Sequence, residues 1–152
     1  METKSLFEIP PIIKKFIDDK IVCPEIPLLP CIYGDFEKMQ IGYRWNPIQK
    51  CSLVTNKPGG WKENWYVIAQ NALGDPFFVD FKDKKYPVYT ATHGMGDWNA
   101  TKIAESIVEF SKILNKIVEM NLILPCSLTF LEGIIDLENE FWIEVNEACQ
   151  GD

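Results

Sequence analysis

The chain has 152 residues, of which 47% are hydrophobic and 24% are charged, and its formal net charge is −7. These proportions are typical of a folded globular domain, and they exclude a disordered chain and a membrane-embedded one. The acidity argues against nucleic acid as a direct partner, because phosphate binding needs clustered lysine and arginine. A basic protein fits better as a partner, although moderate acidity also serves solubility alone.

The N-terminal stretch and the cysteines indicate the compartment. Residues 1–20 carry charges throughout and a proline pair, so they offer no apolar core for secretion and no membrane span. The cysteines are odd in number and form no C-x-x-C pair, so reduced and mostly buried thiols are expected at Cys23, Cys31, Cys51, Cys126 and Cys149. We therefore expect a cytoplasmic protein.

The first third of the chain predicts a helix, a connector and a strand. After the proline pair, apolar residues recur at helical spacing up to Asp18 and Asp19, which predicts a short helix containing Ile12, Ile13, Phe16 and Ile17. Residues 23–30 contain three prolines, too many for a helix or a sheet interior, so we expect an extended connector. Residues 40–46, QIGYRWN, predict the first strand.

Three further strands are predicted in quick succession, over residues 65–71, 76–81 and 86–93. In the first of them Trp65, Val67 and Ala69 alternate with Tyr66 and Ile68, so both faces are apolar and the strand is central. The turn between the first two strands, N-A-L-G-D-P, needs a residue with positive φ. Gly74 supplies that freedom, and Asp75 can bond nearby backbone N–H groups.

The period then changes from two to about 3.6. Apolar residues at steps of four and three predict a helix over 99–122, with Asp97 or Asn99 as its N-cap. Residues 136–149 show a second helical pattern, although F-W-I-E-V within it also suits a strand. Together these elements predict an α+β fold in a single domain over residues 1–152, with a mostly antiparallel sheet, a central meander and flanking α-helices.

The motifs that carry chemistry are few. The only histidine, His93, lies in the glycine-rich stretch T-H-G-M-G-D-W, where it could act as a general base oriented by Asp97. No G-x-S-x-G elbow and no recognisable cysteine nucleophile accompany it, and a lone histidine in such a loop more often bonds backbone groups. One histidine and scattered cysteines supply no metal-ligand cluster. We expect no metal, no cofactor and no enzymatic activity.

Tryptophan is both a core residue and the type most enriched in binding hot spots. There are five, at positions 45, 61, 65, 98 and 142. Trp65 lies in a predicted central strand and is expected in the core. Trp61 follows a Pro-Gly-Gly turn and Trp98 follows His93, so these two are candidates for a partly exposed binding surface, with burial as the more common outcome.

Three segments together resemble the SUKH superfamily. They are W-x-x-x-W-Y-V-I-A-Q-N-x-x-G-D-P-F-F-V-D from residue 61, P-V-Y-x-x-x-H-G-x-G-x-W from residue 87, and I-A-x-S-I-V-E-F from residue 103. This superfamily includes the Smi and Knr type cell-wall assembly regulators of yeast and many bacterial immunity proteins. The similarity covers about residues 61–114, and its most specific part is the G-D-P at residues 74–76 with tryptophan upstream.

The resemblance implies an α+β fold around a mostly antiparallel sheet, and no catalytic residues. It implies an immunity protein that binds a toxin, often a nuclease, and neutralises it by occluding its active site or substrate groove. The partner would be a basic toxin domain encoded nearby, and a homodimer is also compatible with the aromatic strands. The alternative is a regulatory or scaffolding module that engages several partners weakly. The candidate binding residues are Trp61, Glu63, Asp75, Asp83, His93, Asp97 and Trp98.

Overall fold

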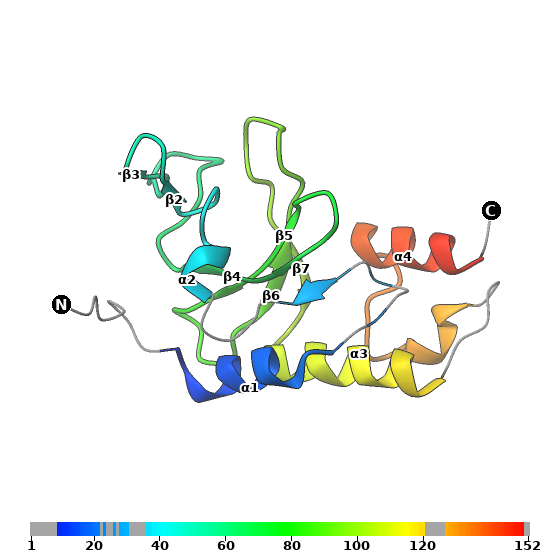
Figure 1. Cartoon of the computed structure of the whole chain (residues 1–152). Coiled ribbons are helices and arrows are strands. Elements are labelled where there is room, and N and C mark those ends of the chain that lie inside the picture. Colours follow the sequence, from blue (N-terminus) through cyan, green and yellow to red (C-terminus); the bar gives the residue numbers. More distant parts are fainter. Residues whose placement is uncertain are drawn as a thin grey trace.

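The computed structural model describes residues 9–21, 23, 26, 28–30, 36–120 and 127–150. Its main sheet has five antiparallel strands in the order β1-β4-β5-β6-β7, and β2 and β3 pair separately (Figure 1). The strands are β1 (Leu29–Pro30), β2 (Trp45–Asn46), β3 (Cys51–Ser52), β4 (Trp65–Gln70), β5 (Pro76–Asp80), β6 (Val88–Thr90) and β7 (Thr101–Ala104). The helices are α1 (Pro11–Asp19), α2 (Phe36–Met39), α3 (Ile107–Met120), the 3-10 turn η1 (Leu128–Leu131) and α4 (Glu140–Gln150). The predicted α+β fold with an antiparallel meander is confirmed.

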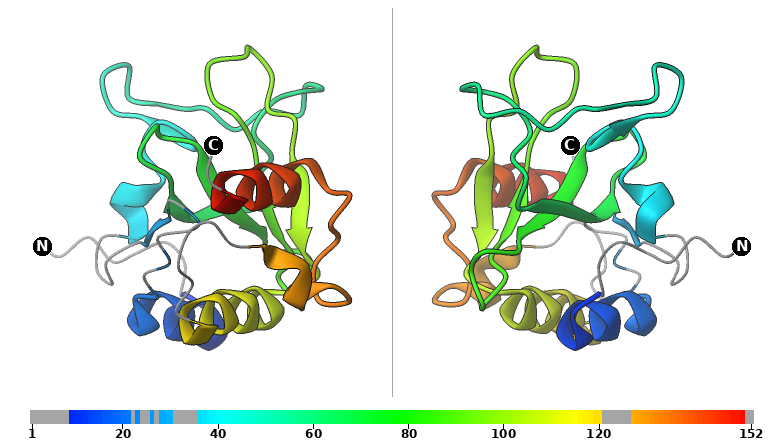
Figure 2. Two further views of the ribbon diagram at one scale, coloured as in Figure 1. Left: turned by 90° about the vertical axis from the view of Figure 1, so that its right-hand side faces the viewer. Right: turned by 90° about the vertical axis from the view of Figure 1, so that its left-hand side faces the viewer.

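The two faces of the main sheet are covered differently. Helices α1 and α3 lie side by side against one face, with the rings of Phe16 and Phe110 stacked 5.9 Å apart, and α4 packs on the same face near β7 (Figures 1 and 2). The opposite face is covered by residues 39–62, which carry the β2–β3 hairpin. A smaller, aromatic core lies beneath this segment, around Trp61 and Phe78.

A β-bulge in β4 changes which residues of this strand face each of the two cores. Val67 pairs with Phe78 and Ala69 pairs with Phe77, so Ile68 is the extra residue. Ile68 and Ala69 therefore both face the helices, whereas Val67 faces the aromatic core. The predicted central strand with two apolar faces is confirmed, but the strict alternation that placed Ala69 beside Val67 is wrong.

Side chains continue the pairing along the outer edge of β4. Beyond the two residues that pair with β1, the buried amide of Gln40 donates from Nε2 to the Val67 carbonyl (2.9 Å) and accepts from the Val67 N–H (2.8 Å). Next along the edge, Arg44 Nη1 donates to the carbonyl of Trp65 (2.8 Å). These bonds satisfy backbone groups that an unpaired edge would expose to other chains.

The opposite edge of the sheet is capped by α4. Asn139 Nδ2 donates to the Lys102 carbonyl (2.8 Å), and Trp142 Nε1 donates to the Ile103 carbonyl (2.9 Å). Asn139 also caps the helix itself, since its Oδ1 accepts from the N–H of Phe141 (3.0 Å). Because residues 140–150 form a helix, the alternative that residues 136–149 form a strand is excluded. The two bonds to β7 hold α4 beside that strand.

The predicted helix over 99–122 is wrong in its first part. Residues 101–104 form β7, and α3 begins only at Ile107. Ser106, not Asp97 or Asn99, caps the helix, because its Oγ accepts from the N–H of Glu109 (3.0 Å). Serine followed three residues later by glutamate is a sequence signal for a helix start, and it outweighs the apolar spacing here.

The predicted strand over 40–46 is also mostly wrong. Only Trp45 and Asn46 are in a strand, because Gly42 (φ +90°) reverses the chain, and Gln40 and Tyr43 turn inwards. The connector predicted over 23–30 ends in β1, and its residues 24, 25 and 27 lie outside the described residues, as do Cys31 and Cys126. The first helix follows the prediction, and it ends where Lys20 adopts φ +44°.

Replacing Gln40 with alanine should destabilise the protein. The Val67 N–H and C=O would lose their partners at a buried site, which costs about 1–3 kcal/mol. Chemical denaturation monitored by tryptophan fluorescence would measure this loss. The exposed Gln49→Ala is the control and should change the unfolding free energy by less than about 0.5 kcal/mol. Equal effects of the two substitutions would contradict the edge-capping role.

Candidate functional site

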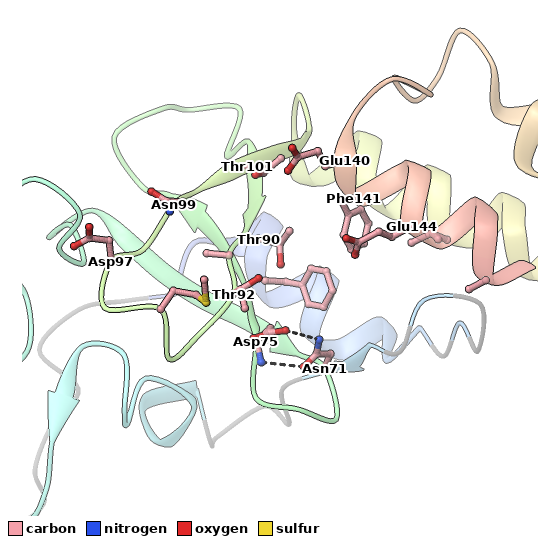
Figure 3. A pocket seen from close by; sticks show the side chains of 15 residues that line it. Asn71, Asp75, Thr90, Thr92, Asp97, Asn99, Thr101, Glu140, Phe141 and Glu144 are labelled. Atoms are coloured by element: carbon pink, nitrogen blue, oxygen red, sulfur yellow. Dashed lines mark hydrogen bonds between the residues drawn. The ribbon is translucent and has the colours of Figure 1, made fainter.

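A pocket of about 470 Å³ lies between α4 and the end of the sheet where the β4–β5 and β6–β7 connections meet (Figure 3). Its floor is a cross-strand row made by Phe77, Thr90 and Thr101 on β5, β6 and β7. Phe141 on α4 forms part of the wall, and its ring meets the Phe77 ring edge-on at 5.8 Å. Phe77 is only 2% exposed, so Phe141 presents the accessible aromatic surface beside the hydroxyl groups of Thr90 and Thr101. The pocket lies within the usual size range of ligand sites.

The charge around the pocket has one sign. Asp75, Asp97, Glu140 and Glu144 line it, and none of the described lining residues is lysine or arginine. Glu140 and Glu144 are one turn apart on α4, a like-charge spacing that costs a few tenths of a kcal/mol. Within the part of the chain that the structure describes, Asp97 and both glutamates form no ion pair. Their negative potential is thus uncompensated.

Asp75 clamps the mouth of the pocket. Its Oδ1 accepts from the backbone N–H of His93 (2.9 Å) and lies 2.6 Å from His93 Nδ1, and its Oδ2 accepts from Asn71 Nδ2 (3.1 Å). Burial alone would raise the pKa of the Asp75 carboxyl, but these hydrogen bonds outweigh burial and hold that pKa below its usual value. The carboxylate therefore joins the β4–β5 turn to the segment that follows β6.

The turn before Asp75 is fixed by its own sequence. Gly74 adopts φ +91°, as the sequence predicts. Asn71 Oδ1 accepts from the N–H groups of Leu73 and Asp75, both at 2.9 Å. The hydroxyl of Tyr43 lies 2.5 Å from the Gly74 carbonyl, and burial together with the charge of Asp75 raises the pKa of Tyr43, so the hydroxyl keeps its proton as a donor.

Asp97 lies at the far rim of the pocket from α4 (Figure 3). Its side chain packs against Gly59 (φ +79°), where a Cβ atom would come within 2.4 Å of the carboxylate. The N–H of the adjacent Trp98 donates to the Gly59 carbonyl (2.7 Å). The segment that covers the aromatic core therefore also holds the loop that carries Asp97.

The structure brings together some of the predicted binding residues. Asp75, His93 and Asp97 lie at the pocket end of the sheet, and the half-buried Trp98 lies beside them against Trp61 at 5.2 Å. The other predicted residues, Trp61, Glu63 and Asp83, do not line the pocket.

Trp61 is 1% exposed and forms the centre of the aromatic core, so the burial expected as the more common outcome is found, and this residue is not part of an exposed binding surface. Its indole N–H donates to the Trp65 carbonyl (3.0 Å), which satisfies its only polar group. Glu63 and Asp83 are exposed near the opposite end of the sheet, at the start of β4 and after β5. These two carboxylates do not line the pocket.

The hypothesis that His93 pairs with Asp97 is not supported by the geometry. His93 Nδ1 pairs with Asp75, from the preceding hairpin turn, and its ring lies over Gly74. The bond holds two loops together, and that role accounts for the histidine without a reaction.

Sequence reasoning missed Glu140 and Glu144. They share a helix face only if residues 136–149 form a helix, and that alternative was open. Asn139 directly before Glu140 was the available signal, because asparagine is a preferred N-cap.

Scans of family models, of curated proteins and of solved structures find no match to this chain. The described part of the chain contains no helix long and apolar enough to cross a membrane. It also contains no group of three or more histidine, cysteine, aspartate or glutamate side chains placed to hold a metal ion.

Asp75→Asn should destabilise the protein by about 1–3 kcal/mol near neutral pH, because hydrogen bonds to a charged acceptor are replaced by weaker ones. The carboxyl has a lowered pKa, so its stabilisation is present above the ordinary value of 3.8 and is lost as the pH falls through the lowered value. Urea denaturation of both proteins, from about pH 6 to about pH 3, should show their difference shrinking only below about pH 4. A difference independent of pH would contradict the ionised clamp.

Proposed function

We propose that this protein is a non-enzymatic binding protein whose acidic pocket receives a basic segment of a partner protein. One observation carries the proposal: Asp97, Glu140 and Glu144 line one pocket together with the ring of Phe141, and no described cation compensates them. Keeping like charges this close costs free energy in the isolated protein. A cationic partner removes that cost on binding.

The lining suits the side chains of lysine and arginine. Their aliphatic stems can pack on the partly exposed Phe141, while the charged end reaches the carboxylates of Glu140 and Glu144. The hydroxyl groups of Thr90 and Thr101 add acceptors on the floor. An acidic pocket also accelerates association with a basic partner by electrostatic steering.

The resemblance to the SUKH superfamily narrows the class of partner. It supports an immunity protein whose partner is a toxin, and a nuclease toxin presents a basic groove because its substrate is anionic. If the surface around the acidic pocket occupies that groove, nucleic acid can no longer bind there. The mechanism is then tight non-covalent occlusion, with no bond made or broken.

Co-expression of the tagged protein with the product of a neighbouring reading frame tests this function. We expect a one-to-one complex that suppresses a nuclease activity of the partner. The double variant Glu140→Lys with Glu144→Lys should weaken binding at least about 100-fold, since two close charge pairs become repulsive. Isothermal titration calorimetry at low and high salt would measure the change.

The matched control reverses two exposed glutamates outside the pocket, Glu37→Lys with Glu119→Lys, which alters the net charge equally. It should change affinity less than about tenfold. If the control weakened binding as much as the pocket variant, the effect would come from net charge alone, and this would contradict the proposed site. Several weak host partners in place of one complex would favour the regulatory or scaffolding module.

A further inference from the structure

The segment that covers the aromatic core differs in charge from the rest of the protein. Residues 39–62 contain Arg44, Lys50, Lys57 and Lys62 and no aspartate or glutamate, in a chain whose net charge is −7. No ion pair joins these cations to a carboxylate within the described residues. Arg44 is used internally on the edge of β4, whereas Lys50 is exposed in the turn of the β2–β3 hairpin.

The same segment exposes large apolar side chains. Ile48, in the hairpin turn, is 91% exposed, and Trp45 and Ile41 are each 44% exposed. Ile41 and Trp45 are bridge partners, so their backbones lie side by side. Exposed apolar side chains beside uncompensated cations are typical of an interaction surface, because an exposed apolar patch with a polar rim is buried when a partner binds.

The hairpin turn is held in one conformation before any contact. Asn46 Oδ1 accepts from the N–H groups of Ile48 (3.0 Å) and Gln49 (3.1 Å). Arg44 fixes the base of the hairpin through the carbonyls of Glu63 (2.6 Å) and Trp65 (2.8 Å). Little conformational entropy would be lost when this turn binds a concave surface.

The described part of the protein contains a surface that complements the hairpin. The pocket between α4 and the sheet is concave and acidic, and the partly exposed Phe141 and the exposed Met95 (70%) are among its lining residues. The hairpin turn presents the cation Lys50 and the exposed Ile48. In Figure 1 the β2–β3 hairpin and α4, which carries Glu140 and Glu144, lie on opposite sides of the molecule, so the hairpin turn can reach these glutamates only on another molecule.

We propose that the β2–β3 hairpin of one molecule docks in the acidic pocket of a second copy of this chain. Ile48 packs against Phe141 and Met95, and Lys50 lies near Glu140 and Glu144. The contact uses different surfaces on the two molecules, so it is heterologous and repeats head to tail. It is small and charge-dependent, so self-association is reversible, with a dissociation constant on the order of micromolar, and it weakens with salt. The inference does not require the proposed function, although any partner in the pocket would compete with it.

Sedimentation velocity of the pure protein over a range of concentrations tests the inference without any partner. The wild type should form dimers and larger species, and high salt should shift them toward monomer. Ile48→Asp in the hairpin, and Glu140→Lys with Glu144→Lys in the pocket, should each weaken association at least about tenfold. Val118→Asp, at an exposed apolar position of α3, is the control and should associate like the wild type.

Mixing the two variants gives the sharper result. The Ile48→Asp molecule keeps an intact pocket and the Glu140→Lys, Glu144→Lys molecule keeps an intact hairpin, so an equimolar mixture should form a one-to-one complex and nothing larger. Circular dichroism melting curves would verify that both variants are folded. A strictly monomeric wild type, or variants that fail to complement one another, would overturn the inference. So would wild-type monomers that bind anionic phosphatidylserine vesicles through the hairpin.

Discussion

The position of residues 39–62 and of the pocket mouth depends on the hydrogen bonds between the buried amide of Gln40 and Val67. A bulge and a very short β1 leave the middle of the β4 edge without a neighbouring strand, and Gln40 supplies both missing bonds to Val67. This holds residues 39–62 across the sheet, where Trp61 fills the aromatic core. A side chain thus replaces a strand, at the cost of one buried polar residue.

The placement of that segment determines the shape of the pocket mouth. Tyr43 bonds the Gly74 carbonyl, and Gly59 receives both the N–H of Trp98 and the side chain of Asp97. Asp75 then ties the β4–β5 turn to His93. The G-D-P turn of the sequence is therefore a structural clamp, and the carboxylate that it carries is largely occupied by its own loops. Asp97, Glu140 and Glu144 remain the pocket carboxylates available to a partner.

Local patterns predicted the parts that depend on neighbouring residues in the chain. The first helix, the meander and the positive φ of Gly74 follow from proline placement, period-two alternation and turn chemistry. The start of α3 was misplaced because Ile103 fits a helical stripe as well as an inward strand position, and pairing of β7 with β6 decides between them. The pocket depends on α4 bonding the edge of β7, a contact about 40 residues apart in sequence that no local pattern encodes.

The protein has two surfaces of opposite charge, an acidic pocket beside α4 and a segment over residues 39–62 that contains lysine and arginine but no aspartate or glutamate. This difference in charge is the basis of both proposals, binding of a basic partner and association with a second copy. Amide hydrogen exchange of the free protein, compared with its complex with the co-purified partner, tests the central claim most directly. The account predicts new protection in residues 90–101 and 140–148, around the pocket. Protection confined to the opposite end of the sheet, around Glu63 and Asp83, would contradict it.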